Sequence, residues 1–295
     1  MTSMYVYFSL GLLVLLLNLH DSAVAHDSAV AYGTGAIHKQ LEHHILMDQN
    51  PYTDGLEAWV DDGYHSTNLD DNLAAAVLSV QGSLQGRPVD LYLEAGCMLG
   101  GSLIRAHSAS KAVNQSAPIT FIALDPFLGD VHMWLWERRD INRNKWKHLR
   151  LENGQPTMYQ RFLANIMKAG IQNDVIPFRT TSIVGFRTIT KLHKKGKLST
   201  LPQVVYLDSA HEGGETHLEL RIAWCMLPPE GGVIMGDDYS KYWPGLVEDI
   251  AKFATYLDKM SDKVATVLSI MKESLGPKRK RLAEIKMERV IIIEA

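Results

Sequence analysis

Five apolar runs of strand length, separated by helical patterns, constrain the fold of this chain more than any other feature. The runs cover residues 89–96, 119–127, 174–180, 204–211 and 231–238. Between them, apolar residues recur at helical spacing in segments 101–111, 159–168, 216–226 and 244–260. Near-continuous apolar strands that alternate with helices are typical of a parallel sheet covered on both faces. The sequence therefore predicts one α/β domain.

Composition narrows the class of partner. The 295 residues carry a formal net charge of -3, so there is no basic field to hold a nucleic-acid backbone. A small-molecule substrate is the better expectation. The two cysteines, Cys97 and Cys225, lack the CxxC spacing of a zinc or redox site, and we expect both to be free thiols.

The N-terminus differs in kind from the rest. Residues 4–19 carry no charge, and the run Ala23-Val24-Ala25 that follows has the small-residue pattern of a signal-peptidase site. Because a membrane span needs about 20 residues, we expect a cleaved signal peptide and a protein of the secretory pathway. The hexapeptide HDSAVA occurs twice in tandem, which places cleavage after Ala25 or Ala31. The alternative is an uncleaved anchor formed by residues 4–19, which is also the only predicted membrane contact.

The sequence divides into three parts. Residues 1–31 are the signal peptide or anchor with its linker, and residues 32–68 are a polar, His-rich extension of helix and loop. Residues 69–295 form the predicted catalytic domain, which a helix at 69–84 opens and two strands at 263–271 and 288–295 close. Asn114 begins a glycosylation sequon, which matters only if the chain enters the secretory pathway.

Each predicted strand ends in polar residues. In open α/β folds the ligand binds beyond the carboxyl ends of the strands, so these residues are the candidate site. The clearest case is Asp237 and Asp238, which directly follow a buried strand. Two adjacent carboxylates repel each other and are costly to dehydrate, so they indicate a bound cation. The alternative is that one of them caps the helix that starts near Trp243.

The loop EAGCMLGGS after the first predicted strand indicates which kind of nucleotide the chain could bind. A dinucleotide fingerprint requires G-x-G-x-x-G, but Met98 stands at its second glycine position, which disfavours NAD. Gly96 and Gly100 would let the backbone approach a ligand closely, and Glu94 offers an acceptor for an ammonium or hydroxyl group. Asp125, at the end of the next strand, is placed to accept both hydroxyls of a ribose.

Five motifs in order carry a family resemblance: LEAGCMLGGS, ALDPFLGDVH, YQRFLANI, VVYLDSAHEGGETHLELRIAW and GGVIMGDDYSKYWPGL. Over residues 69–295 the chain resembles the S-adenosylmethionine-dependent class I methyltransferases. More narrowly it is similar to metal-dependent sugar O-methyltransferases of macrolide biosynthesis and cephalosporin-hydroxylase-like proteins, and distantly to catechol O-methyltransferase. The resemblance implies a Rossmann-like, seven-stranded, mostly parallel sheet whose last strand is antiparallel.

The resemblance also assigns roles to residues. The methionine half of the cofactor would lie along the glycine loop, the ribose on an acid, and the adenine near a Thr-Ser pair; the residues are Glu94, Gly96, Gly100, Ser102, Asp125, Thr181 and Ser182. The metal ligands fall on Asp208, Asp237 and Asp238, which would hold Mg²⁺ or another hard divalent cation through oxygen. The sugar enzymes have a glutamate where this chain has Asp237.

His211 would be the catalytic base, since the D-x-x-H pattern of the sugar enzymes places it three residues after Asp208. An imidazole near neutral pH can accept the proton that an attacking hydroxyl must lose. The alternative is a histidine that binds a backbone carbonyl in the turn. Residues 129–150, with three tryptophans among charged residues, would form either an aromatic lid over the acceptor or an ordinary amphipathic helix.

Two classes of function remain. The first is a Mg²⁺-dependent S-adenosylmethionine O-methyltransferase acting on a hydroxylated small molecule or sugar. The second is an inactive binding or assembly protein on the same fold, because a fold does not guarantee chemistry. A nucleotide-dependent oxidoreductase is a weaker third. The sequence leaves open the identity of the acceptor and whether the chain forms a homo-oligomer.

Overall fold

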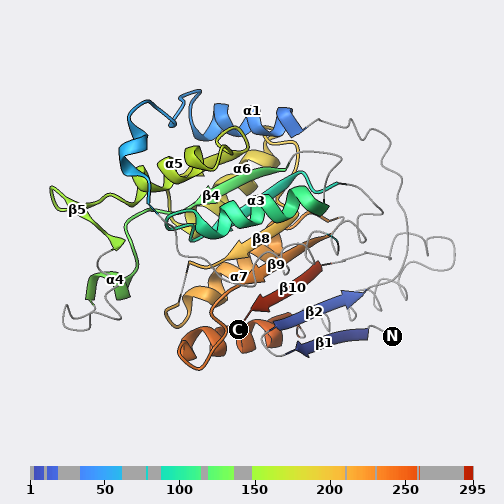
Figure 1. Cartoon of the computed structure of the whole chain (residues 1–295). Helices are drawn as coiled ribbons and strands as arrows, with labels where there is room; N and C mark the ends of the chain where they lie inside the picture. Colours follow the sequence, from blue (N-terminus) through green and yellow to red (C-terminus); the bar gives the residue numbers. More distant parts are fainter. Residues whose placement is uncertain are drawn as a thin grey trace.

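A single large sheet organises the computed structural model of this chain (Figure 1). The structure describes residues 3–9, 12–18, 34–61, 78, 88–113, 119–135, 148–209, 211–229, 231–257, 259 and 289–294. The strand order in the sheet is β1-β2-β10-β9-β8-β3-β4-β7. Neighbouring strands from β7 to β10 run parallel to one another, so six strands place their carboxyl ends along one edge.

The strands and helices alternate along the chain as the apolar pattern predicts. The parallel strands are β3 (Leu91–Ala95), β4 (Thr120–Leu124), β7 (Val175–Phe178), β8 (Val204–Leu207), β9 (Gly232–Gly236) and β10 (Arg289–Glu294). The helices are α1 (Thr34–Ile45), α3 (Gly101–Val113), α4 (Val131–Leu135), α5 (Met158–Lys168), α6 (Ser182–Lys194), α7 (Glu215–Met226) and residues 244–257. A short 3-10 helix (Leu56–Trp59) and a small hairpin of β5 (Leu151–Glu152) and β6 (Gln155–Pro156) complete the described part.

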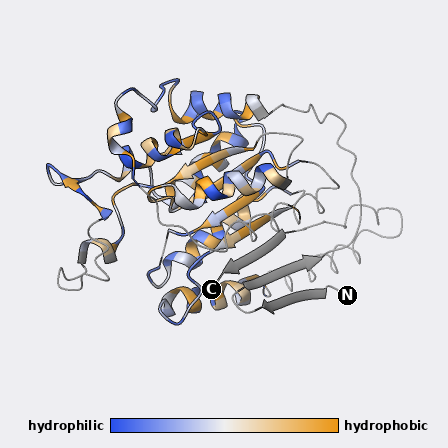
Figure 2. Ribbon diagram, viewed as in Figure 1, coloured by the Kyte–Doolittle hydropathy of each residue, from blue (hydrophilic) through white to orange (hydrophobic). Residues whose placement is uncertain are grey.

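Both faces of the sheet are covered by helices. Side chains alternate along each strand, so Tyr92 of β3 packs in the cluster with α3 and α5, whereas Leu91 and Leu93 pack in the cluster with α1, α6, α7 and helix 244–257. The strands that Figure 2 colours between these layers, from β3 to β9, are mostly hydrophobic. The predicted mostly parallel α/β sheet with helices on both faces is confirmed.

The last strand runs in the opposite direction to the one expected. β10 pairs parallel with β9, where the family pattern implied an antiparallel strand. An apolar run such as RVIIIE has the same hydrophobic pattern in either direction, so the sequence could not fix the direction of the strand. Its antiparallel neighbour is β2.

The N-terminal apolar segment extends the sheet. β1 (Ser3–Ser9) and β2 (Leu12–Asn18) pair antiparallel, and β2 pairs with β10. The sheet therefore has eight described strands, where seven were expected, because this segment supplies two of them. Among the helices that the structure describes, none combines the length and apolarity needed to cross a membrane.

The N-terminal extension packs on the domain. Ile37 and Leu41 of α1 are buried, so this helix is more than a solvated segment. The carboxylate of Asp61 pairs with the guanidinium of Arg161, a residue of α5 that is 2% exposed, and also with Arg150. The backbone amide of Asp61 donates to Asn165 Oδ1 at 2.8 Å. The segment from Leu56 to Asp61 thus lies against α5, whereas α1 packs on the other face of the sheet.

Several predictions made from the sequence lie outside the described residues. They are the strand at 263–271, the sequon at Asn114, and the tryptophans Trp136 and Trp146 of the proposed lid. Of the helix expected at 69–84, only residue 78 is described. Both cysteines are free, Cys97 buried and Cys225 exposed, as expected.

Replacing Asp61 by alanine should destabilise the protein strongly. The change leaves the buried Arg161 guanidinium without its carboxylate, and an uncompensated buried charge typically costs about 3–5 kcal/mol. Urea unfolding of the full chain measures the loss. Asp48→Ala is the matched control, because its pair with His43 is exposed on both sides and should contribute less than about 1 kcal/mol. Equal losses in the two variants would contradict a buried pair at Asp61.

Candidate functional site

The carboxyl ends of four neighbouring strands surround one cavity of about 210 Å³. It opens beyond β3, β4, β8 and β9, where the strand order brings these ends side by side. Seven of the residues singled out from the sequence line it: Gly96, Ser102, Asp125, Asp208, His211, Asp237 and Asp238. Residues from four separate motifs of the sequence therefore meet at a single place.

Gly96 allows the end of β3 to approach the end of β8 closely. Its backbone φ is 91°, and a Cβ built there would lie 2.0 Å from the carbonyl oxygen of Asp208. No side chain fits at that distance, so only glycine permits this contact between the loop after β3 and the end of β8. Gly100, with φ of 85°, faces the ring of Phe162 on α5, where a Cβ would come within 3.2 Å, and it does not line the cavity.

Glu94 is turned away from the position predicted for it. Its side chain is fully buried, and its carboxylate accepts hydrogen bonds from Ser102 Oγ at 2.5 Å and Tyr92 Oη at 3.1 Å. Burial raises the pKa of Glu94 to about 7, and the hydrogen bonds from Ser102 and Tyr92 oppose that rise. Ser102, which does line the cavity, stands between Glu94 and any ligand there.

Asp125 lies where the second strand meets the glycine loop. Its Oδ2 accepts from the amide of Met98 at 2.9 Å, and its Oδ1 accepts from the amide of Phe127 at 2.5 Å. Burial raises the pKa of Asp125, while these backbone hydrogen bonds favour the charged form and oppose the shift. The amide of Cys97 also donates to this carboxylate, so Asp125 is a fixed acceptor with part of its hydrogen-bonding capacity already used.

The Thr-Ser pair lies apart from the cavity. Thr181 and Ser182 stand at the start of α6, and neither lines the cavity. Ser182 hydrogen bonds to Glu219 of α7, which also accepts from Ser209 Oγ at 2.7 Å. Burial raises the pKa of Glu219, and the two serine hydrogen bonds oppose the shift. No feature of the sequence singled out Glu219, because a glutamate in an amphipathic helix usually faces solvent.

Two aspartates and a histidine form a compact group at the ends of β8 and β9. Asp208, His211 and Asp238 each offer one ligand atom, and these atoms lie within 4.8 Å of one another. His211 Nε2 lies 2.7 Å from Asp238 Oδ2 and 3.9 Å from Asp208 Oδ1. Asp238 adopts a left-handed backbone with φ of 63°, which aspartate tolerates better than most residues. Ligand atoms of these types, at this spacing, could hold a metal ion.

Asp237 is held from two sides. Its Oδ1 accepts from the amide of Asp238 at 2.7 Å, and its Oδ2 accepts from Tyr206 Oη at 3.1 Å. Burial raises the pKa of Asp237, with the charge of Asp238 acting in the same direction and the two hydrogen bonds opposing it. The resemblance predicts Asp208, Asp237 and Asp238 as the metal ligands. The compact group instead consists of Asp208, His211 and Asp238. Tyr206 was missed, although its spacing of two from Asp208 puts both on the same face of the strand.

Comparisons with known proteins find only weak similarity, and only among solved structures. No family model matches the chain, and no curated protein matches it. Among solved structures, the O-methyltransferase TomG from Streptomyces achromogenes is 14% identical, with 76% of this chain and 78% of that chain covered and a TM-score of 0.42. CalS11, a TDP-rhamnose 3'-O-methyltransferase of calicheamicin biosynthesis, is 14% identical, with 77% and 87% covered and a TM-score of 0.39. Similarity of this degree does not assign a function, so the site's own residues have to carry it.

The buried Glu94 should give stability a distinct dependence on pH. Its pKa is about 7 in the folded protein against an ordinary 4.5, so between these values the unfolded chain loses a proton that the folded protein keeps. Folding is therefore weakened as the pH rises through this window, by roughly 3 kcal/mol in total. Glu94→Gln removes that dependence.

The measurement is urea unfolding of wild type and Glu94→Gln at several pH values between about 4.5 and 8. The difference in unfolding free energy should move in favour of the variant as the pH rises. A difference that stays constant with pH would show that Glu94 has the same pKa in both states.

Proposed function

We propose that this protein is a Mg²⁺-dependent O-methyltransferase that transfers a methyl group from S-adenosylmethionine to a hydroxyl of a small molecule or sugar. The observation that carries the proposal is the convergence of the glycine loop, Asp125 and the Asp208, His211 and Asp238 group on one cavity. This convergence supports a nucleoside site and a hydroxyl-activating group within the same cavity.

The cofactor half of the site fits a nucleoside. Asp125 would accept a hydrogen bond from the ribose, and Gly96 with Ser102 would line the methionine half. Glu94 does not line the cavity, but it orients the Ser102 hydroxyl by accepting its hydrogen bond. Thr181 and Ser182 remain proposed neighbours of the adenine, at the start of the helix that follows β7.

The metal half of the site fits a hard divalent cation. Asp208 and Asp238 present carboxylate oxygens, and Asp237 keeps one free lone pair on each oxygen beyond its bonds to Tyr206 and Asp238. When bound, Mg²⁺ would stabilise negative charge on the acceptor oxygen as it loses its proton. The chain's own side chains have to orient the acceptor and take that proton.

His211 would take the proton. Its Nε2 donates to Asp238 Oδ2 at 2.7 Å, so Nδ1 is the nitrogen that would accept the proton, and the side chain is 12% exposed at the cavity wall. In the reaction the acceptor oxygen forms a bond to the methyl carbon as the carbon–sulfur bond of the sulfonium breaks. The electron pair leaves with sulfur as a neutral thioether, and the hydroxyl proton passes to His211.

An inactive binding protein is the alternative within the same cavity. It would bind S-adenosylmethionine and have no turnover, and the organised group around His211 is the observation that favours an enzyme. Turnover of acceptors that carry hydroxyl groups, followed as transfer of a labelled methyl group, separates the two.

Two variants distinguish the metal ligand from the base. Asp238→Asn keeps the size of the side chain but removes a charge, so it should weaken Mg²⁺ binding, and excess Mg²⁺ should partly restore turnover. His211→Ala should keep Mg²⁺ and cofactor affinity near wild type while turnover falls by about 10²–10⁴. Calorimetry with Mg²⁺ and methyl-transfer rates provide the two readings.

Asp130→Asn is the matched control. Asp130 lines the same cavity but lies outside the compact group, so Mg²⁺ affinity should stay near the wild-type value. Loss of Mg²⁺ by His211→Ala would make the histidine a ligand. Full turnover of that variant at neutral pH would reject it as the base.

The cellular location of the protein is a separate proposal. We propose that the first residues are a signal peptide removed after Ala25 or Ala31, so that the enzyme enters the secretory pathway; an anchor at residues 4–19 is the alternative. Cleavage would remove β1 and β2 and leave β10 as the edge of the sheet. N-terminal sequencing of the protein from its native host should therefore begin after one of these alanines. Retention of Met1 or Thr2 would exclude cleavage.

A further inference from the structure

The loop 211–214, which carries His211, is held by the segment that follows the two aspartates. We propose that Trp243, Gly245 and Asp249 form a clamp that positions the His211 imidazole for proton transfer. The three are positioning residues, since each acts through the loop or the ring and none lines the 210 Å³ cavity. The inference rests on the proposed function, in which His211 is the base.

The first contact of the clamp is a ring on a ring. The indole of Trp243 lies against the imidazole of His211, with ring centroids 4.4 Å apart and planes at 33°. Contact of this kind limits rotation of the imidazole, because the ring cannot turn without leaving the indole face. Nε2 is thereby kept toward Asp238.

The second contact is a close approach of two backbones. Gly245 lies in the first turn of helix 244–257, and a Cβ built there would come within 3.0 Å of the amide nitrogen and 3.1 Å of the Cα of Gly213. The helix therefore touches the loop directly, and an added methyl group would have to displace it by a few tenths of an ångström.

The third contact is a cap supplied by a different helix. Asp249 is fully buried, and its Oδ2 accepts from the amide of Gly214 at 2.6 Å and from the amide of His217 at 3.2 Å. These amides belong to the start of α7, whose own N-cap residue is Gly214 and has no side chain. A carboxylate at a helix N-terminus satisfies free amides and interacts favourably with the helix dipole.

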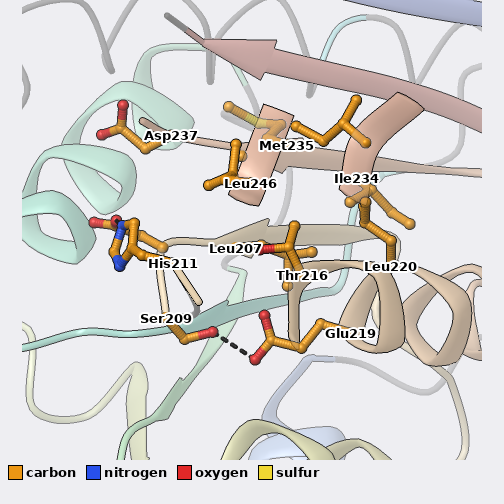
Figure 3. Close-up of a pocket in the computed structure, with 13 residues that line it drawn as sticks. Leu207, Ser209, His211, Thr216, Glu219, Leu220, Ile234, Met235, Asp237 and Leu246 are labelled. Carbon is orange, nitrogen blue, oxygen red and sulfur yellow. Dashed lines mark hydrogen bonds and ion pairs between the residues drawn. The ribbon is translucent and has the colours of Figure 1, made fainter. Parts of the chain in front are cut away.

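Apolar packing between the two helices is incomplete at this level. A small cavity of about 20 Å³ lies between them and the sheet, with Leu246 on one side and Thr216 and Leu220 of α7 on the other (Figure 3). Farther along the two helices, Phe253 packs on His217 and Trp224 of α7, and the three clamp contacts add to this packing at the loop. His211 lies at one end of this gap in Figure 3.

Small displacements of a base have large effects on rate. A misplacement of about 1 Å can cost on the order of a hundredfold in turnover, although the side chain itself is unchanged. The clamp should therefore affect turnover and the environment of the imidazole, while leaving the cofactor half of the cavity intact.

Gly245→Ala tests the clamp without removing any hydrogen bond. The added Cβ should push the loop away from helix 244–257, shift the His211 imidazole resonances in NMR spectra of the full chain, and lower kcat by about tenfold. The KM for S-adenosylmethionine should change by less than about twofold, because the glycine loop and Asp125 are untouched.

Gly213→Ala is the matched control. It adds a methyl group on the loop side of the same contact, but a Cβ there meets no atom within 4 Å, and Gly213 is not among the glycines with positive φ. Its imidazole resonances and kcat should match those of wild type.

Asp249 provides a second, independent pair of variants. Asp249→Ala removes the cap and should lower kcat and shift the imidazole resonances, whereas Asp249→Asn keeps an oxygen acceptor and should restore much of both. A purely structural role would show instead as equal losses of turnover, cofactor affinity and unfolding stability in the alanine variant.

Two results would overturn the proposal. One is a Gly245→Ala protein whose imidazole resonances and kcat match Gly213→Ala. The other is a parallel loss of cofactor affinity and turnover in both Gly245→Ala and Asp249→Ala. The NMR reading needs no acceptor, so it still tests the clamp if wild type proves to have no methyl-transfer activity, which would count against the proposed function alone.

Discussion

The register of three parallel strands is the constraint on which the site depends. Ala95 of β3 pairs with Leu207 of β8, and Leu207 pairs with Gly236 of β9. The next residues, Gly96, Asp208 and Asp237, therefore lie in one row at the edge of the sheet. A slip of one residue in any strand would turn its polar end into the core and its apolar residues out of it. Gly96 tightens this row, because only glycine lets the loop after β3 reach the carbonyl of Asp208.

Three acidic groups in and around this row, Glu94, Asp125 and Asp237, would be unstable as anions through burial alone. Burial raises the pKa of Glu94, Asp125 and Asp237, and each is held by local donors: Ser102 and Tyr92 for Glu94, backbone amides for Asp125, and Tyr206 with the amide of Asp238 for Asp237. Such fixed carboxylates need little rearrangement when a ligand arrives, which is the usual advantage of a preorganised site. Hydrogen-bond donors and a bound cation act on these groups in the same direction, since both favour the charged form.

Much of this arrangement was predictable from the sequence, for a definite physical reason. Parallel strands buried on both faces are read from apolar runs, and their polar ends must meet at one edge, so Asp125, Asp208 and Asp237 could be brought together before the fold was known. Contacts that depend on side-chain direction could not be foreseen. The inward turn of Glu94 needs Tyr92 and Ser102, and the position of His211 beside Asp238 needs a loop whose shape is set by Trp243 and Asp249. The direction of β10 was equally hidden, because its apolar run is symmetric.

The proposed function requires that the cavity bind S-adenosylmethionine through Asp125. The direct measurement is isothermal titration of S-adenosylmethionine into the full chain, with and without Mg²⁺, for wild type and for Asp125→Ala. The account predicts that wild type binds one equivalent and that the variant binds it about tenfold to a hundredfold more weakly, since losing hydrogen bonds to a charged group typically costs about 1.5–3 kcal/mol. No binding by wild type, or equal affinity in the two proteins, would contradict it.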